Sequence, residues 1–193
     1  MEDIFAFAHC RSFHTAGRTL ELVLTDLVQI KRLGEDKIAE NQQLRVFMKV
    51  HGYPERRLRK LAEEIEEEID CQSCANCCRV GETNITKRDV ERASKYLRIK
   101  PGAFVGQYTT SSAMEDETIL RRTANGCIFL DGNDCSIYDA RPDTCRYFPH
   151  LVRGQGPLVT RMWNMVDRAT YCPIVYNTME AFKEVLKFTK GKK

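Results

Sequence analysis

Cysteine is the residue type in this sequence whose number and spacing indicate chemistry. Eight of the nine cysteines lie between Cys71 and Cys172. A C-x2-C step is compact enough for two thiolates to bind one metal atom, so overlapping steps followed by distant cysteines indicate a metal site. The candidate metal ligands are Cys71, Cys74, Cys77, Cys78, Cys127, Cys135, Cys145 and Cys172.

Disulfides or redox thiols are the alternative, and the choice depends on the compartment. Glu2 and Asp3 stand where a secretory signal has basic residues, and the first apolar stretch ends at His9. No segment approaches the ~18 apolar residues of a membrane span. We therefore expect a cytoplasmic protein without membrane contact, where disulfides rarely persist. Metal binding is favoured, and Cys10 is left without a role.

Two kinds of metal centre fit eight thiolates. Eight cysteines make two closed tetrahedral zinc sites. Alternatively, Cys71-x2-Cys74-x2-Cys77 has the spacing of the bacterial ferredoxin triplet, and Cys172-Pro173 is similar to the last ligand of that motif, although it lies far away in the sequence. Thiolates are soft ligands that accept zinc or iron, so zinc and a 4Fe–4S iron–sulfur cluster both stay open.

The adjacent residues Cys77 and Cys78 bear on the number of centres. In extended backbone, consecutive side chains point to opposite sides, so these two would serve different centres unless the chain turns tightly there. We expect two neighbouring metal centres, or one cluster and a separate metal site.

Other residues near the cysteines are secondary candidates. Arginine can donate to thiolate sulfur and stabilise a centre, and we expect Arg141 and Arg146 to act in this way as cofactor-binding residues. His150 is expected to be structural, because so many thiolates are available. Four aromatic residues are expected to pack around the site and exclude water: Tyr138, Tyr147, Phe148 and Trp163.

The first 70 residues are predicted to form a helical element, either a hairpin or three helices. Two helices are expected over about 19–33 and 35–50. The third begins near Pro54 and carries the apolar stripe Leu58, Leu61, Ile65 and Ile69. Its acidic end, residues 63–70, is expected to be a solvated face, with docking of a protein partner as the alternative.

Residues 71–193 are predicted to form a cysteine-cluster metal-binding domain with a C-terminal helix. Thr86 and Asp89 form a capping box, and Pro101 and Pro173 each open a helix. Residues 118–130 are more strand-like, and 131–134 form a turn. We expect an α+β fold that is mostly α with little sheet, in which metal holds an irregular cysteine-rich segment beside the helical element.

Three stretches resemble a known family. They are Cys71-Gln-Ser-Cys-Ala-Asn-Cys-Cys78, Gly126-Cys127-Ile-Phe-Leu-Asp131 and Cys135-Ser-Ile-Tyr-Asp-Ala-Arg-Pro-Asp-Thr-Cys-Arg-Tyr-Phe-Pro149. The resemblance, over about residues 71–172, is to the CxxCxxCC or YkgJ-type cysteine cluster proteins. It implies zinc or iron chelation by the eight cysteines, and a relationship to flagellin lysine-N-methylase-like proteins that carry an iron–sulfur cluster. Ala75 departs from the glycine that many members have after the second cysteine.

Several classes of function follow. The first is a metal-binding protein with a structural role, and with electron transfer or metal sensing as further options. The second is a protein-modifying enzyme or enzyme subunit of the lysine N-methylase type, although no glycine-rich strand–loop–helix turn is found. A net charge of +3 without an arginine/aromatic repeat disfavours nucleic acid as a partner. A protein partner would bind through the N-terminal helices.

Overall fold

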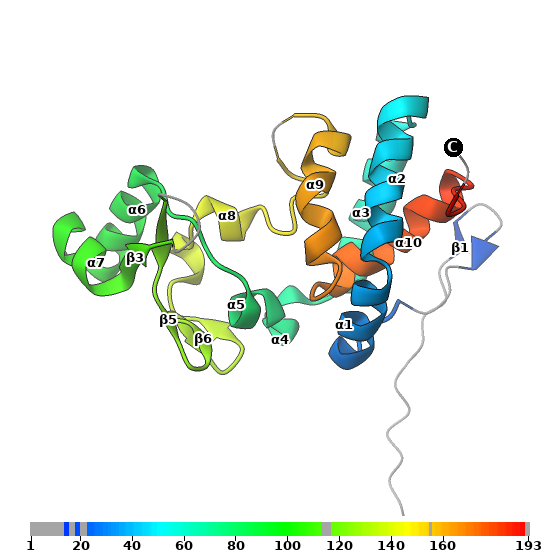
Figure 1. The fold of residues 1–193 in the computed structure, drawn as a ribbon. Helices are drawn as coiled ribbons and strands as arrows, with labels where there is room; N and C mark the ends of the chain where they lie inside the picture. Colours follow the sequence, from blue (N-terminus) through cyan, green and yellow to red (C-terminus); the bar gives the residue numbers. More distant parts are fainter. Residues whose placement is uncertain (1–13, 16–17, 20–22, 113–116, 155, 192–193) are drawn as a thin grey trace, which may run out of the picture.

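The computed structural model describes residues 14–15, 18–19, 23–112, 117–154 and 156–191 of the chain. Figure 1 shows two lobes side by side, which are connected by two short helices. The helical lobe contains α1 (Leu27–Asp36), α2 (Ile38–His51), α3 (Glu55–Glu68), α9 (Leu158–Arg168) and α10 (Pro173–Val185). The connecting helices are α4 (Cys71–Cys74) and α5 (Asn76–Val80).

The hairpin lobe is built from shorter elements. Its helices are α6 (Lys87–Leu97), α7 (Pro101–Tyr108), the 3₁₀ helix η1 (Tyr138–Ala140) and α8 (Asp143–Arg146). Its strands are β3 (Thr109–Ser111), β4 (Thr118–Leu120), β5 (Arg122–Thr123), β6 (Gly126–Cys127), β7 (Leu130–Asp131) and β8 (Asp134–Cys135). They pair antiparallel in twos, β3 with β4, β5 with β6 and β7 with β8. A further pair, β1 (His14–Thr15) with β2 (Arg18–Thr19), precedes the helical lobe.

The core of the helical lobe joins segments from both ends of the chain. Helix α2 packs on α9, and α3 packs on α10. Buried residues recur at the spacing of an amphipathic helix on α2, α3 and α9, whereas α10 is buried on more than one side. Fully buried examples are Leu44 and Met48 of α2, Leu58 of α3, Met162 of α9 and Phe182 of α10. Most of the expected stripe of α3 is therefore confirmed.

The hairpin lobe has a smaller core of its own. Val90 and Ala93 of α6 and Phe104 of α7 pack with Leu120 and Ile137. Cys127 and Cys135 lie against this cluster and are half-buried. Because an isolated two-stranded hairpin is marginally stable in water, these short strand pairs depend on what they pack against.

The predicted fold class is confirmed, with mostly helices and few short strand pairs. The helix starts after Thr86, at Pro101 and at Pro173 are also confirmed. The first helix begins later than expected, at Leu27, and helix α9 was not expected at all. The division into 1–70 and 71–193 stays a prediction; α3 and α10, one from each side of it, share a core.

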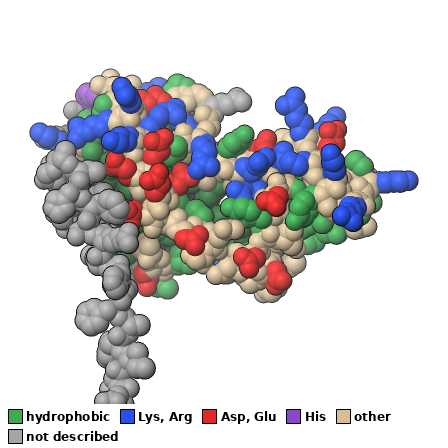
Figure 2. All heavy atoms as spheres, turned by 180° about the vertical axis from the view of Figure 1, so that it is seen from behind, with side chains coloured by type: hydrophobic (Ala, Val, Ile, Leu, Met, Phe, Trp, Pro, Cys, Tyr) green, Lys and Arg blue, Asp and Glu red, His purple; other side chains and the backbone are tan. Residues whose placement is uncertain are grey.

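The surface carries both signs of charge. Figure 2 shows Lys and Arg side chains gathered toward one rim of the molecule, with Asp and Glu side chains among and below them and hydrophobic atoms exposed in between. Within the described ranges, no helix is both long and apolar enough to cross a membrane.

Asp89 connects the hairpin lobe's first helix to the segment that bears Cys145. Its carboxylate accepts hydrogen bonds from the Thr86 backbone N–H (2.9 Å) and hydroxyl (2.6 Å), and from the Asp143 N–H (3.0 Å). It also pairs with Arg92. Burial raises the pKa of Asp89, but these hydrogen bonds and the Arg92 charge outweigh burial and hold the pKa below its ordinary value.

Replacing Asp89 with Asn should lower the free energy of unfolding at pH 7 by about 2 kcal/mol, because the carboxylate is only 1% exposed and its donors lose a charged acceptor. The folded pKa is depressed, so this contribution is complete above the unfolded pKa of about 4 and is lost as pH falls through the folded pKa. Urea unfolding at pH 7 and below pH 4 measures it. Glu91→Gln, exposed on the same helix, is the control; equal stability of the two variants at pH 7 would contradict the expectation.

Candidate metal centre

Two short helical turns carry the first four cysteines. The Asp70 side chain accepts from the Gln72 N–H (2.9 Å) and starts α4. Ala75 then adopts a left-handed conformation (φ 45°), which ends α4 and begins α5. This conformation favours Gly, so Ala at this position is strained. The chain therefore reverses within one residue, and Cys71, Cys74 and Cys77 come from two successive turns.

Cys77 and Cys78 lie in helix α5 and not in extended backbone. Successive side chains on a helix diverge by about 100°, so the two thiols still face different surroundings. They remain close enough to interact. The Cys77 thiol donates to the Cys78 sulfur, and this contact raises the pKa of Cys77.

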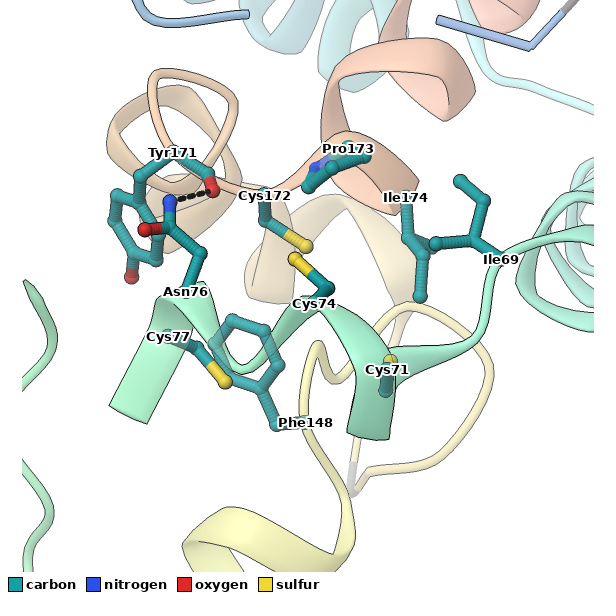
Figure 3. A pocket seen from close by; sticks show the side chains of 10 residues that line it. All are labelled: Ile69, Cys71, Cys74, Asn76, Cys77, Phe148, Tyr171, Cys172, Pro173 and Ile174. Atoms are coloured by element: carbon teal, nitrogen blue, oxygen red, sulfur yellow. Dashed lines mark hydrogen bonds between the residues drawn. The ribbon is translucent and has the colours of Figure 1, made fainter. Parts of the chain in front are cut away.

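A first thiol group (Cys71, Cys74, Cys77 and Cys172) lines a cavity of about 20 Å³ between α4, α5 and the start of α10. Figure 3 shows the sulfur atoms of Cys74 and Cys172 facing one another, with Cys77 beside the ring of Phe148. The Asn76 side chain donates to the Tyr171 carbonyl (2.7 Å) and ties α5 to the residue before Cys172. The fold thus brings the distant Cys-Pro pair to the triplet.

The first thiol group is poorly solvated. Burial raises the pKa of the Cys172 thiol to about 12, and this residue is only 5% exposed. Cys71 is exposed overall, but partial burial of its thiol and the nearby Glu66 carboxylate raise its pKa to about 11. The thiols of Cys71 and Cys172 are neutral at pH 7, and a bound cation would be needed to stabilise their thiolate forms.

A second thiol group (Cys78, Cys127, Cys135 and Cys145) lies on the hairpin-lobe side of α5. Gly126 of β6 approaches the backbone of Cys78 so closely that an added Cβ would lie 2.6 Å from the Cys78 carbonyl oxygen. The Thr83 hydroxyl lies 3.7 Å from the Cys145 sulfur. Burial raises the pKa of Cys145 to about 12; Thr83 opposes this rise, and Cys78, Cys127 and Cys135 add to it.

Arginine side chains surround Cys78. Its pKa is lowered to about 7 by the hydrogen bond from Cys77 and, against the effect of burial, by the charges of Arg79, Arg141 and Arg122. Arg79 also donates to the Cys74 carbonyl (2.9 Å), and Arg122 donates to the carbonyls of Gly81 and Arg79. Of the three, only Arg141 was expected to contribute, so the contributions of Arg79 and Arg122 were missed although both are near cysteines in the sequence.

Arg141 is the better placed of the two expected arginines. Its guanidinium stacks on the Tyr138 ring, 3.6 Å from the centroid, and its charge lowers the pKa of Cys78. Its Nη1 atom is buried and makes no hydrogen bond to the parts of the chain that are described. Arg146 is exposed on α8, and its role stays a prediction.

Replacing Arg141 with Gln should weaken metal binding by about tenfold, because outer donors to metal ligands typically contribute this much or more. Competition with a chromophoric zinc chelator measures the affinity. Arg88→Gln, on the exposed face of α6, removes the same charge away from the cysteines and should leave affinity unchanged. If the two variants bind metal with equal affinity, Arg141 does not contribute to metal binding.

Other expected residues have mixed outcomes. Phe148 lines the first cavity as expected, but Tyr147 and Trp163 are 46% and 68% exposed and do not shield the site. His150 does not line the cavity; it lies edge-on to Phe148. Cys10 is outside the described residues.

The acidic end of α3 is mostly exposed, as expected for a solvated face. Glu63, Glu66, Glu67 and Asp70 line a second cavity of about 310 Å³, together with Cys71 and Arg153. Glu66 pairs with Arg153 at 2.9 Å. Docking of a protein partner here stays a prediction.

The donor set suits a metal that binds thiolates. Two groups of four thiols meet at α5, and on the side of the second group lies a buried guanidinium N–H of Arg141 that has no hydrogen-bond partner among the described residues. As they stand, no three Cys, His, Asp or Glu side chains of the described residues already have an arrangement that could hold a metal ion. The thiols must therefore move inward on binding, which is expected where binding and folding are coupled.

Comparison with known proteins identifies the family but gives no structural relative. No solved structure matches the chain significantly. Residues 70–173, more than half of the chain, match the CxxCxxCC family, described as a putative zinc- or iron-chelating domain. The match begins one residue before Cys71 and ends one residue after Cys172, so it includes both thiol groups. The chain therefore belongs to the CxxCxxCC family of metal-chelating cysteine cluster proteins.

Proposed function

We propose that this chain is a metal-binding protein that holds zinc or an iron–sulfur cluster through the thiolates of its eight clustered cysteines. One observation carries the proposal. Cysteines from the connecting helices, from the first residue before α10 and from β6, β8 and α8 converge in two groups where the lobes meet. A metal bound there would join α4 and α5 to the start of α10 and to β6, β8 and α8, so its role would be at least structural.

The residues of the chain supply the ligands and their surroundings. Each thiol must lose a proton to bind metal, and burial opposes that loss at Cys145 and Cys172. Arg79, Arg122 and Arg141 favour the thiolate at Cys78. Zinc would supply a closed tetrahedral cross-link, and an iron–sulfur cluster would also supply an electron acceptor. The ferredoxin-like order of the first thiol group favours a cluster there, whereas its cavity of about 20 Å³ has room for little more than one water-sized sphere.

Anaerobic purification followed by an absorption spectrum and analysis for iron, sulfide and zinc tests the proposal. We expect either zinc alone or iron with matching sulfide, at a fixed ratio to the chain. Cys10→Ser should bind the same amount. A chain that takes up neither metal after reconstitution, and whose eight thiols all react freely with an alkylating reagent, would overturn the proposal.

A further inference from the structure

We propose that the eight cysteines form two separate four-thiolate metal centres, one made by the first thiol group and one by the second. The inference rests on the proposed function and adds to it which ligands share a metal. Helix α5 supplies Cys77 to one centre and Cys78 to the other, so the two centres are joined through a single peptide bond.

The first centre follows from the lining of the small cavity. Its walls contain Cys71, Cys74, Cys77 and Cys172, and none of the other four clustered cysteines. Ile69, Phe148 and Ile174 supply apolar walls to the same space. The Asn76–Tyr171 hydrogen bond fixes α5 against the chain that leads into Cys172.

The second centre follows from how the hairpins lie against one another. Leu120 N–H donates to the Thr83 carbonyl (2.9 Å), and Thr83 in turn contacts the Cys145 sulfur. Ser136 N–H donates to the Phe129 carbonyl (2.9 Å), which places the strands of Cys127 and Cys135 next to each other. Helix α5 contacts β6 directly, and the close approach at Gly126 brings Cys78 to this side.

The two centres have opposite electrostatic surroundings. Cys71 of the first centre is exposed and borders the cavity that Glu63, Glu66 and Asp70 line. Three arginines lie beside the second: Arg79 follows Cys78 in α5, Arg122 donates to the Arg79 carbonyl, and Arg141 stacks on Tyr138. A four-thiolate centre is negatively charged, so arginines stabilise it and carboxylates destabilise it. The first centre should therefore release its metal at about a tenfold lower chelator concentration than the second.

Stepwise chelation of the metal-loaded chain as purified, with pulses of N-ethylmaleimide and peptide mass mapping, tests the division. We expect Cys71, Cys74, Cys77 and Cys172 to become alkylated together as the first portion of the metal leaves. The other four should stay protected until a higher chelator concentration. Alkylation of all eight in one step, or in blocks that mix the two groups, would overturn the division.

Variants give a second, independent measurement. Cys74→Ser should lose the metal of the first centre and keep Cys127, Cys135 and Cys145 protected, whereas Cys135→Ser should do the reverse; Cys10→Ser is the matched control. Loss of protection across both groups in Cys74→Ser, with the secondary structure retained, would count against two centres. A chain that binds no zinc or iron fails the proposed function, whereas a chain that binds metal but mixes the two groups fails only the division.

Discussion

Replacing Gly126 with Ala should lower the free energy of unfolding by about 3 kcal/mol and reduce the metal that the chain retains. Gly126 has φ 123°, a conformation that side chains rarely adopt, and strain of this kind costs about 1–3 kcal/mol. The added Cβ would also lie 2.6 Å from the Cys78 carbonyl oxygen and 2.8 Å from the Arg79 Cα. Both are backbone atoms that cannot rotate away, so β6 must move from α5 and carry Cys127 away from Cys78.

Gly132→Ala separates the effect of backbone strain at a positive φ from the effect of the close contact with α5. Gly132, in the turn between β7 and β8, also has a positive φ (60°), but nothing lies within 4 Å of its added Cβ. Its substitution should cost only about 1 kcal/mol, the left-handed penalty alone. Urea unfolding and metal analysis of both variants provide the comparison. If Gly126→Ala retains as much metal and stability as Gly132→Ala, the close approach of β6 to α5 does not hold the second thiol group together.

Local signals predicted the parts of the fold that depend on neighbouring residues. The Thr86–Asp89 capping box and the prolines at positions 101 and 173 start helices where the sequence indicates, because each acts within one helical turn. Helix α9 was missed although Leu158, Met162 and Met165 repeat at helical spacing and are all fully buried. This spacing is that of an ordinary amphipathic helix and indicates α9 from the sequence alone.

The local sequence does not predict that Cys172 lies beside Cys71, Cys74 and Cys77. It requires α10 to pack on α3, and it is fixed by a hydrogen bond between Asn76 and Tyr171, which are 95 positions apart. The ferredoxin-like spacing did indicate Cys172-Pro173 as a distant ligand. Spacing alone does not show which cysteines come together through the left-handed turn at Ala75. The proposed division of the thiols therefore rests on contacts between segments that are distant in the sequence.

Removing the metal should unfold the hairpin lobe and leave most of the helical lobe intact. The helical lobe has a continuous apolar core that includes Leu44, Leu58, Met162 and Phe182 and needs no cross-link. The hairpin lobe has strands of two or three residues and a smaller core, so we expect its stability to depend on the metal. Since the binding free energy of a structural metal is folding free energy, amide exchange in β5 to β8 should become about 100-fold faster or more.

Hydrogen exchange with mass-spectrometric detection, on the chain before and after chelation under reducing conditions, measures this effect for each segment. Peptides from α2 and α3 are the internal control, because neither helix contains a cysteine and both are held by apolar packing. The first turn of α10 should show an intermediate change, since Cys172 directly precedes it in the core of the helical lobe. Equal acceleration of exchange in all segments would mean that the metal stabilises the whole chain as one cooperative unit. Unchanged exchange in β5 to β8 would show that the hairpins stay folded without metal.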